Sequence, residues 1–184
     1  LLFYPLPSTF MRIISGFYKG RRINAPKNLP VRPTTDRAKE ALFNILENRY
    51  DLNDKKILDL FSGTGNISFE FSSRYSTSIT SIDKNIQCIN FIEKVSNEYQ
   101  FNIKTIQSDS LIFVRTTQDK FDIIFADPPY NFLNYQKLKN LIIEKKLIKE
   151  NGCLIIEHDK NTSFEGENIE LRKYGTVHFS IFLF

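Results

Sequence analysis

A carboxylate, two prolines and an aromatic ring follow one another at Asp127-Pro128-Pro129-Tyr130. The apolar run before them, residues 121–126, is typical of a buried strand, so the tetrapeptide should begin where that strand ends. Each proline fixes φ and lacks an N–H, which leaves nearby carbonyls available as acceptors. A carboxylate beside such carbonyls suits a planar amino group, and Tyr130 can stack on the ring that carries it. The tetrapeptide alone leaves adenine, cytosine, guanine and amide substrates open.

A glycine-bearing turn spans residues 59–65, with the sequence Asp-Leu-Phe-Ser-Gly-Thr-Gly. Its glycines let the backbone approach a ligand closely. Dinucleotide-binding turns share the Gly-x-Gly spacing, but the third glycine they require is absent, because Asn-Ile-Ser follows at 66–68. Asp59 precedes the glycines, where a carboxylate attracts a cation and repels a pyrophosphate. S-adenosylmethionine, with its ammonium and sulfonium charges, fits this turn, and its expected contacts are Asp59, Ser62, Gly63, Thr64 and Gly65.

Acidic residues follow the other predicted strands as well. Asp83 and Asp109 come after the second and third strands, and Asp127 comes after the fourth. One acid at a strand end is more often a helix cap than a ligand contact. Four in succession favour a shared ligand site, because the carboxyl ends of parallel strands meet at one edge. We therefore expect Asp83 to accept hydrogen bonds from ribose hydroxyls, and Asp109 with Ser110 to contact adenine.

Alternating strands and helices must position these residues. The patterns of apolar residues predict an α/β fold of the Rossmann-like type, in which a mostly parallel, doubly wound sheet carries helices on both faces. A C-terminal antiparallel hairpin and a short N-terminal arm complete it. The predicted strands are 55–60, 78–82, 103–107, 121–126, 153–157, 169–174 and 177–184, and the predicted helices are 38–46, 66–71, 87–99, 110–115 and 135–148.

Basic residues are concentrated near the N-terminus. Residues 12–37 hold seven of them against one acid, so this segment carries +6 while the whole chain carries +4. Such an arm suits contact with a phosphate backbone, and a solvated loop or hairpin is the alternative. The predicted RNA-binding residues are Arg12, Lys19, Arg21, Arg22, Arg32 and Arg37.

The 184 residues suit one domain. We assign 11–37 to the basic arm and 38–184 to the main domain, and interpret 1–10 as an extension or an expression remnant, because Met11 is the sole methionine. No apolar run is long enough to span a bilayer. The two cysteines and two histidines have no metal-ligand spacing. A cytoplasmic monomer without a metal or a membrane partner is expected.

Two sets of residues carry a resemblance to a known family. The turn at 59–65 together with Asp-Pro-Pro-Tyr resembles the class I, Rossmann-like methyltransferases that act on exocyclic amines of bases. The segments Met11-Arg-Ile-Ile-Ser-Gly16, Lys19-Gly-Arg-Arg22 and Arg32-Pro-Thr-Thr-Asp-Arg37, followed by Glu40-Ala-Leu-Phe-Asn-Ile-Leu46, are similar to the bacterial family that methylates guanine N2 of 16S ribosomal RNA. The resemblance covers about residues 11–184.

The resemblance implies methyl transfer from S-adenosylmethionine to N2 of one guanosine in the small ribosomal subunit or its assembly intermediate. It places the methionine part of the cofactor at 59–65, the ribose at Asp83 and the adenine at Asp109. It assigns the binding of the target base to the predicted catalytic residues, which are Asp127, Pro128, Pro129 and Tyr130. Two alternatives stay open: DNA adenine-N6 methylation, for which a chain this short has little room to read sequence, and a non-catalytic RNA-binding or ribosome assembly factor.

Overall fold

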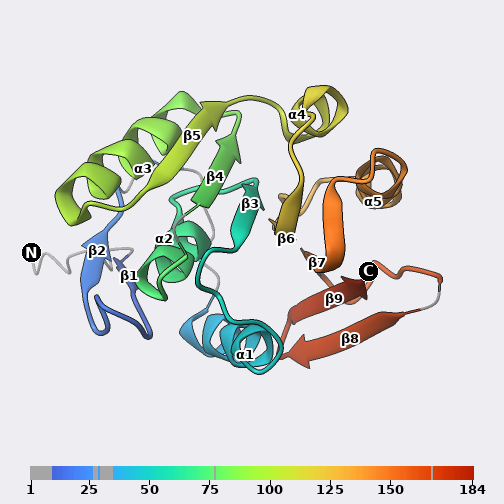
Figure 1. The fold of residues 1–184 in the computed structure, drawn as a ribbon, viewed down its shortest axis with the longest axis horizontal. Coiled ribbons are helices and arrows are strands. Elements are labelled where there is room, and N and C mark those ends of the chain that lie inside the picture. Colours follow the sequence, from blue (N-terminus) through green and yellow to red (C-terminus); the bar gives the residue numbers. More distant parts are fainter. Residues whose placement is uncertain (1–9, 27–28, 30–34, 77, 167) are drawn as a thin grey trace, which may run out of the picture.

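A seven-stranded sheet forms the centre of the molecule (Figure 1). The computed structural model describes residues 10–184 except 27–28, 30–34, 77 and 167. The strand order is β5-β4-β3-β6-β7-β9-β8. The sheet strands are β3 (Lys56–Leu60), β4 (Ser78–Asp83), β5 (Ile103–Gln107), β6 (Phe121–Ala126), β7 (Ile148–His158), β8 (Ile169–Tyr174) and β9 (Val177–Leu183), and the helices are α1 (Asp36–Glu47), α2 (Asn66–Ser73), α3 (Ile86–Tyr99), α4 (Ser110–Thr116) and α5 (Tyr135–Glu144).

The topology confirms the predicted fold class. β3 pairs in parallel with both β4 and β6, and β5 and β7 extend the parallel sheet on either side. β9 runs antiparallel to β7, and β8 runs antiparallel to β9. The chain winds outward from β3 to β5 and then returns to β6, so the strand order reverses between β3 and β6. In sheets of this kind ligands bind outside the carboxyl ends of the strands at such a reversal.

The two faces of the sheet are covered by different helices (Figure 1). One buried apolar cluster joins α1 and α2 to alternate residues of the central strands, such as Ile57 and Phe125. A second cluster joins Val114 of α4 and Leu138 of α5 to the other set of alternate residues in the same strands, such as Leu58. The period of two along each strand thus supplies both faces with apolar side chains, as a sheet buried on both sides requires.

A small hairpin packs against the helices at one end of the sheet. Its strands are β1 (Phe10–Arg12) and β2 (Arg22–Asn24), which pair antiparallel. Met11 and Ile23 are buried in a third apolar cluster with α3 and with Phe69 of α2. The basic arm therefore contributes to the core, although its division from the main domain stays a prediction. Residues 1–9 of the predicted extension lie outside the described residues, and Phe10 begins β1.

Two predicted boundaries near residue 148 were wrong. Helix α5 ends at Glu144 instead of 148, because Lys146 adopts a left-handed conformation with φ of 52°. β7 then begins at Ile148, five residues before the predicted start, and a register irregularity opposite 121–123 accommodates its first part. Lys149, Glu150 and Asn151 are polar, so the pattern of apolar residues did not predict a strand in this segment.

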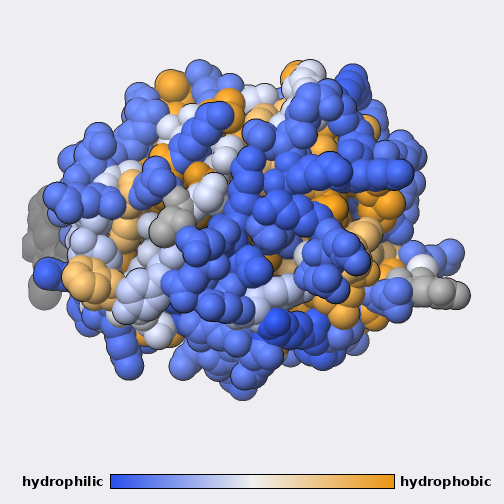
Figure 2. All heavy atoms as spheres, in the orientation of Figure 1, coloured by the Kyte–Doolittle hydropathy of each residue, from blue (hydrophilic) through white to orange (hydrophobic). Residues whose placement is uncertain are grey.

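The face of the molecule seen in Figure 1 is largely hydrophilic, with apolar side chains in scattered groups (Figure 2). Within the described ranges, no helix combines the length and the apolar content needed to cross a membrane.

Candidate functional site

A cavity of about 360 Å³ opens at the carboxyl ends of the parallel strands. Its volume lies in the range of small-molecule sites. The structure brings to it residues from loops more than 60 positions apart in the sequence. Of the predicted catalytic and cofactor-binding residues, it is lined by Asp59, Ser62, Gly63, Thr64, Asp83, Asp109, Ser110, Asp127, Pro128, Pro129 and Tyr130.

Asp83 shapes the glycine-bearing turn. Its two carboxylate oxygens each accept a backbone N–H at 2.8 Å, one from Gly63 and the other from Asn85. The predicted ribose acid is therefore held between the turn and the start of α3, and it lines the cavity. Because both oxygens are fixed, the position of Asp83 is set before any ligand arrives.

Gly65 is the one predicted cofactor residue absent from the cavity lining. It adopts a left-handed conformation with φ of 79° at the start of α2. A Cβ atom at this position would lie 2.8 Å from Cγ1 of Ile92 on α3. The absence of a side chain at position 65 thus allows the turn to pack closely against α3.

Asp59 is buried beneath the turn, with 1% of its surface exposed. Its carboxylate accepts a hydrogen bond from the Ser68 hydroxyl at 2.5 Å, and that hydroxyl lies 2.6 Å from the Ser81 hydroxyl. Burial raises the pKa of Asp59 to about 7; the Ser68 hydrogen bond opposes the shift, and the nearby Asp83 charge adds to it. A cationic group placed in the cavity would stabilise the ionised form.

Asp109 caps helix α4, which is the common role of an acid at a strand end. Its Oδ1 accepts from the N–H groups of Leu111 and Ile112. The same residue lines the cavity beside Ser110, which is 3% exposed. The cap thus fixes the position of Asp109 beside the cavity.

The Asp-Pro-Pro-Tyr segment leaves β6 as an open turn of trans peptides. The Pro129 carbonyl accepts from the Phe132 N–H at 2.8 Å, so of the two proline carbonyls it is the one used by the turn. The Pro128 carbonyl is thereby the better placed acceptor for a substrate amine. Tyr130 exposes 69% of its surface at the rim of the cavity, where a flat ring could stack on it.

Twelve residues that line the cavity were not predicted from the sequence, among them Phe61, Phe132, Tyr135, Glu157 and His158. Phe61 has φ of 60°, an uncommon conformation for an aromatic residue, and its ring packs edge-on to that of Phe132. Glu157 and His158 follow the rule that located the other acids, since they end β7. The sequence pattern predicted acids at the ends of four strands and missed this fifth strand end.

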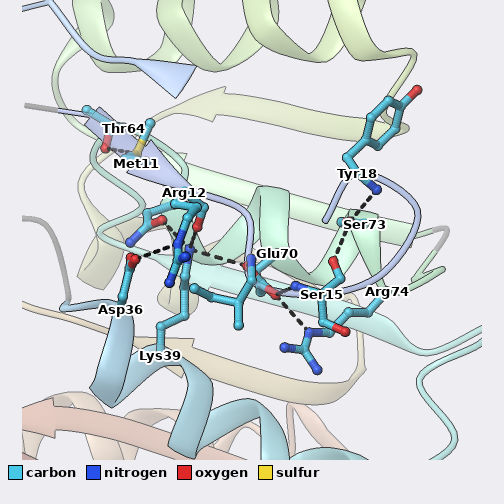
Figure 3. A network of polar contacts seen from close by, with 12 residues as sticks. Met11, Arg12, Ser15, Tyr18, Asp36, Lys39, Thr64, Glu70, Ser73 and Arg74 are labelled. Atoms are coloured by element: carbon cyan, nitrogen blue, oxygen red, sulfur yellow. Dashed lines mark hydrogen bonds and ion pairs between the residues drawn. The ribbon is translucent and has the colours of Figure 1, made fainter. Parts of the chain in front are cut away.

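The hairpin is fixed to the main domain by a buried charged network (Figure 3). Glu70 of α2 is fully buried and accepts the backbone N–H groups of Ile14 and Ser15 at 2.8 and 3.0 Å. Lys39 of α1 donates to the Arg12 carbonyl at 2.6 Å and lies 3.3 Å from the Glu70 carboxylate. Burial lowers the pKa of Lys39, and the Glu70 carboxylate opposes that shift.

The hairpin runs along α2 from one end to the other (Figure 3). The Thr64 hydroxyl, just before α2, contacts Sδ of Met11 at 2.9 Å. At the other end the Ser73 carbonyl accepts the Phe17 N–H, and a Cβ atom on Gly16 would come within 1.8 Å of that carbonyl oxygen. The turn of the hairpin therefore lies about one helix length, roughly 12 Å for eight residues, from the cavity.

Five of the six predicted RNA-binding residues are exposed: Arg12, Lys19, Arg21, Arg22 and Arg37. Arg12 forms an ion pair with Asp36 at 2.9 Å, and Arg22 lies over the Phe10 ring. Arg32 lies outside the described residues. Among the described residues, no group of three or more histidine, cysteine, aspartate or glutamate side chains could hold a metal ion.

A family model supplies the decisive comparison. The model described as Conserved hypothetical protein 95 matches residues 11–183. The chain belongs to this family. The Conserved hypothetical protein 95 match covers the hairpin, the glycine-bearing turn and the Asp-Pro-Pro-Tyr segment together.

Curated relatives of this Conserved hypothetical protein 95 member include ribosomal RNA methyltransferases. Ribosomal RNA small subunit methyltransferase D of Buchnera aphidicola subsp. Acyrthosiphon pisum is 37% identical over 154 residues, 82% of this chain and 79% of the relative. Putative rRNA methyltransferase YlbH of Bacillus subtilis is 30% identical over 189 residues, 94% of this chain and 98% of the relative. The predicted resemblance to small-subunit rRNA methyltransferases is confirmed.

Solved structures agree with this placement. Putative methyltransferase yhhF from Escherichia coli has a TM-score of 0.81 at 26% identity, covering 95% of this chain and 97% of its own. A Thermus thermophilus 16S rRNA N2 G1207 methyltransferase (RsmC), in complex with AdoMet and guanosine, has a TM-score of 0.76 over 96% of this chain and 50% of its own. At 14% identity the second likeness concerns the fold alone.

Proposed function

We propose that this protein transfers a methyl group from S-adenosylmethionine to the N2 amine of a guanosine in 16S ribosomal RNA. The observation that carries the proposal is the single cavity in which Asp127-Pro128-Pro129-Tyr130 faces the turn at 59–65. Family membership and the relatives named for small-subunit rRNA methylation support the choice of substrate.

The cavity residues suit a methyl donor that is cationic. When bound, S-adenosylmethionine supplies an electrophilic methyl group on a sulfonium centre. Asp59 would hold the ammonium group, Asp83 the ribose hydroxyls, and Asp109 with Ser110 the adenine. These acids fit the charge of the group, because an ionised carboxylate only accepts hydrogen bonds and attracts cations at short range.

Asp127 and the Pro128 carbonyl would hold the substrate amine. The amine of guanine is conjugated with its ring and is weakly nucleophilic, so two acceptors are needed to draw its nitrogen toward sp3 geometry, with the lone pair released from conjugation and aimed at the methyl group. Asp127 also stabilises the positive charge that develops on nitrogen, a preorganised electrostatic effect. Tyr130 would stack on the base with about 1–3 kcal/mol. The base must leave any stack to reach this cavity, so an unpaired or flipped guanosine is the substrate.

Methyl transfer to small ribosomal subunits tests the proposed function. Subunits from cells lacking this activity should accept a labelled methyl group, and mapping should locate it on N2 of one guanosine. Label in DNA would favour adenine-N6 methylation instead. Binding of RNA with no transfer to any small-subunit particle would favour a non-catalytic assembly factor.

The affinity for S-adenosylmethionine should rise with pH around neutrality. Asp59 in the free protein has a pKa of about 7, and only its ionised form attracts the ammonium group. Binding should therefore be about tenfold weaker at pH 6 than at pH 8, and it should release a proton near pH 6.5. Calorimetry in two buffers with different ionisation enthalpies measures both effects.

Asp59→Asn is the control for that prediction. The variant should bind the cofactor weakly and without this pH dependence, and an unchanged pH profile would contradict the assignment.

The raised pKa of Asp59 has the opposite effect on the folding stability of the unliganded protein. The unfolded chain releases this proton near pH 3.8 and the free folded protein near pH 7, so this residue makes the unliganded protein less stable as pH rises between those values.

Removing two charges from the hairpin should weaken RNA binding. Arg21→Ala with Arg22→Ala removes two exposed cations, and the slope of log affinity against log salt should fall by about 1.5 if both contact phosphates. Cofactor affinity should not change, because neither residue lines the cavity. Lys120→Ala with Lys173→Ala removes two exposed lysines elsewhere and serves as the matched control. Equal salt slopes for both double variants would show that the hairpin charges do not contact RNA.

A further inference from the structure

A second carboxylate lies next to Asp127 at the edge of the sheet. In the ladder between β6 and β7, Phe125 is the partner of Ile155, and Asp127 and Glu157 each follow two residues later. Asp127 directly follows β6 and Glu157 lies near the end of β7, so the two residues stand at the ends of neighbouring strands, which are spaced by about 4.8 Å. Both of them line the cavity.

Glu157 is buried and still lines the cavity. It exposes 5% of its surface. The pKa of Tyr135 is raised to about 12, first by burial and then by the negative charges of Asp127, Asp159 and Glu157. These three carboxylates therefore lie near the ring of Tyr135, which lines the cavity. A buried carboxylate is costly unless it has donors, and a ligand N–H beside Asp127 would be one more donor for it.

The neighbours of Glu157 are committed to other contacts. Asp159 accepts from the N–H groups of Asn161 and Thr162 in a turn. The His158 ring contacts the Asp159 carbonyl at 2.7 Å and the Ser180 hydroxyl at 2.8 Å. Glu157 lines the cavity from the strand next to Asp127, and both carboxylates already take part in interactions within the protein, to which a substrate N–H would add.

We propose that Glu157 accepts a hydrogen bond from N1–H of the target guanine while Asp127 holds the N2 amine, and that this pair selects guanine. This inference rests on the proposed function. Among the four RNA bases only guanine carries an exocyclic amine beside a ring N–H. Adenine and cytosine present a ring lone pair beside the amine, which a carboxylate repels and leaves unpaired. Sites built on such hydrogen bonds reject the analogue that lacks the donor.

Three nucleosides test this proposal in the presence of S-adenosylhomocysteine. Guanosine has the N1–H donor, 2,6-diaminopurine riboside keeps the N2 amine but has a lone pair at N1, and N1-methylguanosine has its donor blocked. Titrations followed by NMR should show guanosine binding to the unmodified protein at least about tenfold more tightly than either analogue. Equal binding of guanosine and the diaminopurine would overturn the proposal, whether or not any variant folds.

Glu157→Gln assigns the selection to this residue. Its amide can either accept or donate, so the preference for guanosine over the diaminopurine should fall to near one. Glu150→Gln, the same change at an exposed position of β7, should keep the full preference. Full preference in Glu157→Gln would overturn the assignment. If the unmodified protein methylates guanine N2 yet shows no preference, only this inference fails; if it binds no guanosine and transfers no methyl group, the proposed function fails as well.

Discussion

Asp127→Ala should lower the turnover of methyl transfer by about 10²- to 10³-fold, the usual cost of removing one preorganised group that stabilises transition-state charge. The reason is that, in the proposed function, the carboxylate both orients the amine and balances the charge that develops on its nitrogen. Cofactor affinity should change little, because the proposed cofactor contacts are Asp59, Asp83 and Asp109. RNA affinity should also be largely kept. Single-turnover kinetics, with separate binding measurements, would check this.

Asp119→Ala is the matched control for that variant. Asp119 is an exposed acid just before β6, where it pairs with Lys56 at 2.9 Å. Its removal should leave turnover near that of the unmodified protein. A rate for Asp127→Ala equal to that of the control would remove Asp127 from the catalytic role and favour a non-catalytic binding protein.

Glu70→Gln should lower the free energy of unfolding by about 3–5 kcal/mol, the usual cost of breaking a buried ion pair from one side. Glu70 is fully buried and accepts from Ile14, Ser15 and Arg74, so the neutral amide would leave Lys39 and Arg74 without their buried counter-charge. The hairpin should detach first. Urea unfolding measures the loss, and hydrogen exchange of the Ile14 and Ser15 amides locates it.

Glu47→Gln provides the comparison for this second prediction. Glu47 also pairs with Arg74, at 2.6 Å, but its side chain is 44% exposed. Solvent screens this pair, so the loss should not exceed about 1 kcal/mol. Equal losses for the two variants would mean that the hairpin is held by its apolar contacts alone and that the buried charges contribute nothing specific.

The sequence predicted most strands well because apolar alternation is a local property. The strands 103–107, 121–126 and 169–174 match the structure residue for residue. The end of α5 was missed because the left-handed Lys146 has no strong signal in its residue type. The hairpin was predicted only as an arm, since a burial partner such as Phe69 lies far away in the sequence and cannot be read from local spacing.

Within the candidate site, spacing alone located the acids that end four strands, because a carboxylate after an apolar run marks a strand end. It could not say how each acid is used. The structure shows Asp109 capping a helix, Asp83 holding two backbone N–H groups and Asp59 buried with a raised pKa. Each of these depends on neighbours brought together by the fold.

The sequence by itself predicted a cationic methyl donor beside an amine-binding tetrapeptide on a mostly parallel sheet, and the structure confirms the sheet. Only the tertiary structure decided which acids lie at neighbouring strand ends. Glu157 stands 30 residues from Asp127 in the chain, and the β6–β7 register, in which Ala126 is the partner of Ile156, places the two at adjacent strand ends. Register and burial arise from contacts between distant segments. The tetrapeptide left the choice of base open, and in our proposal that choice depends on how β6 pairs with β7.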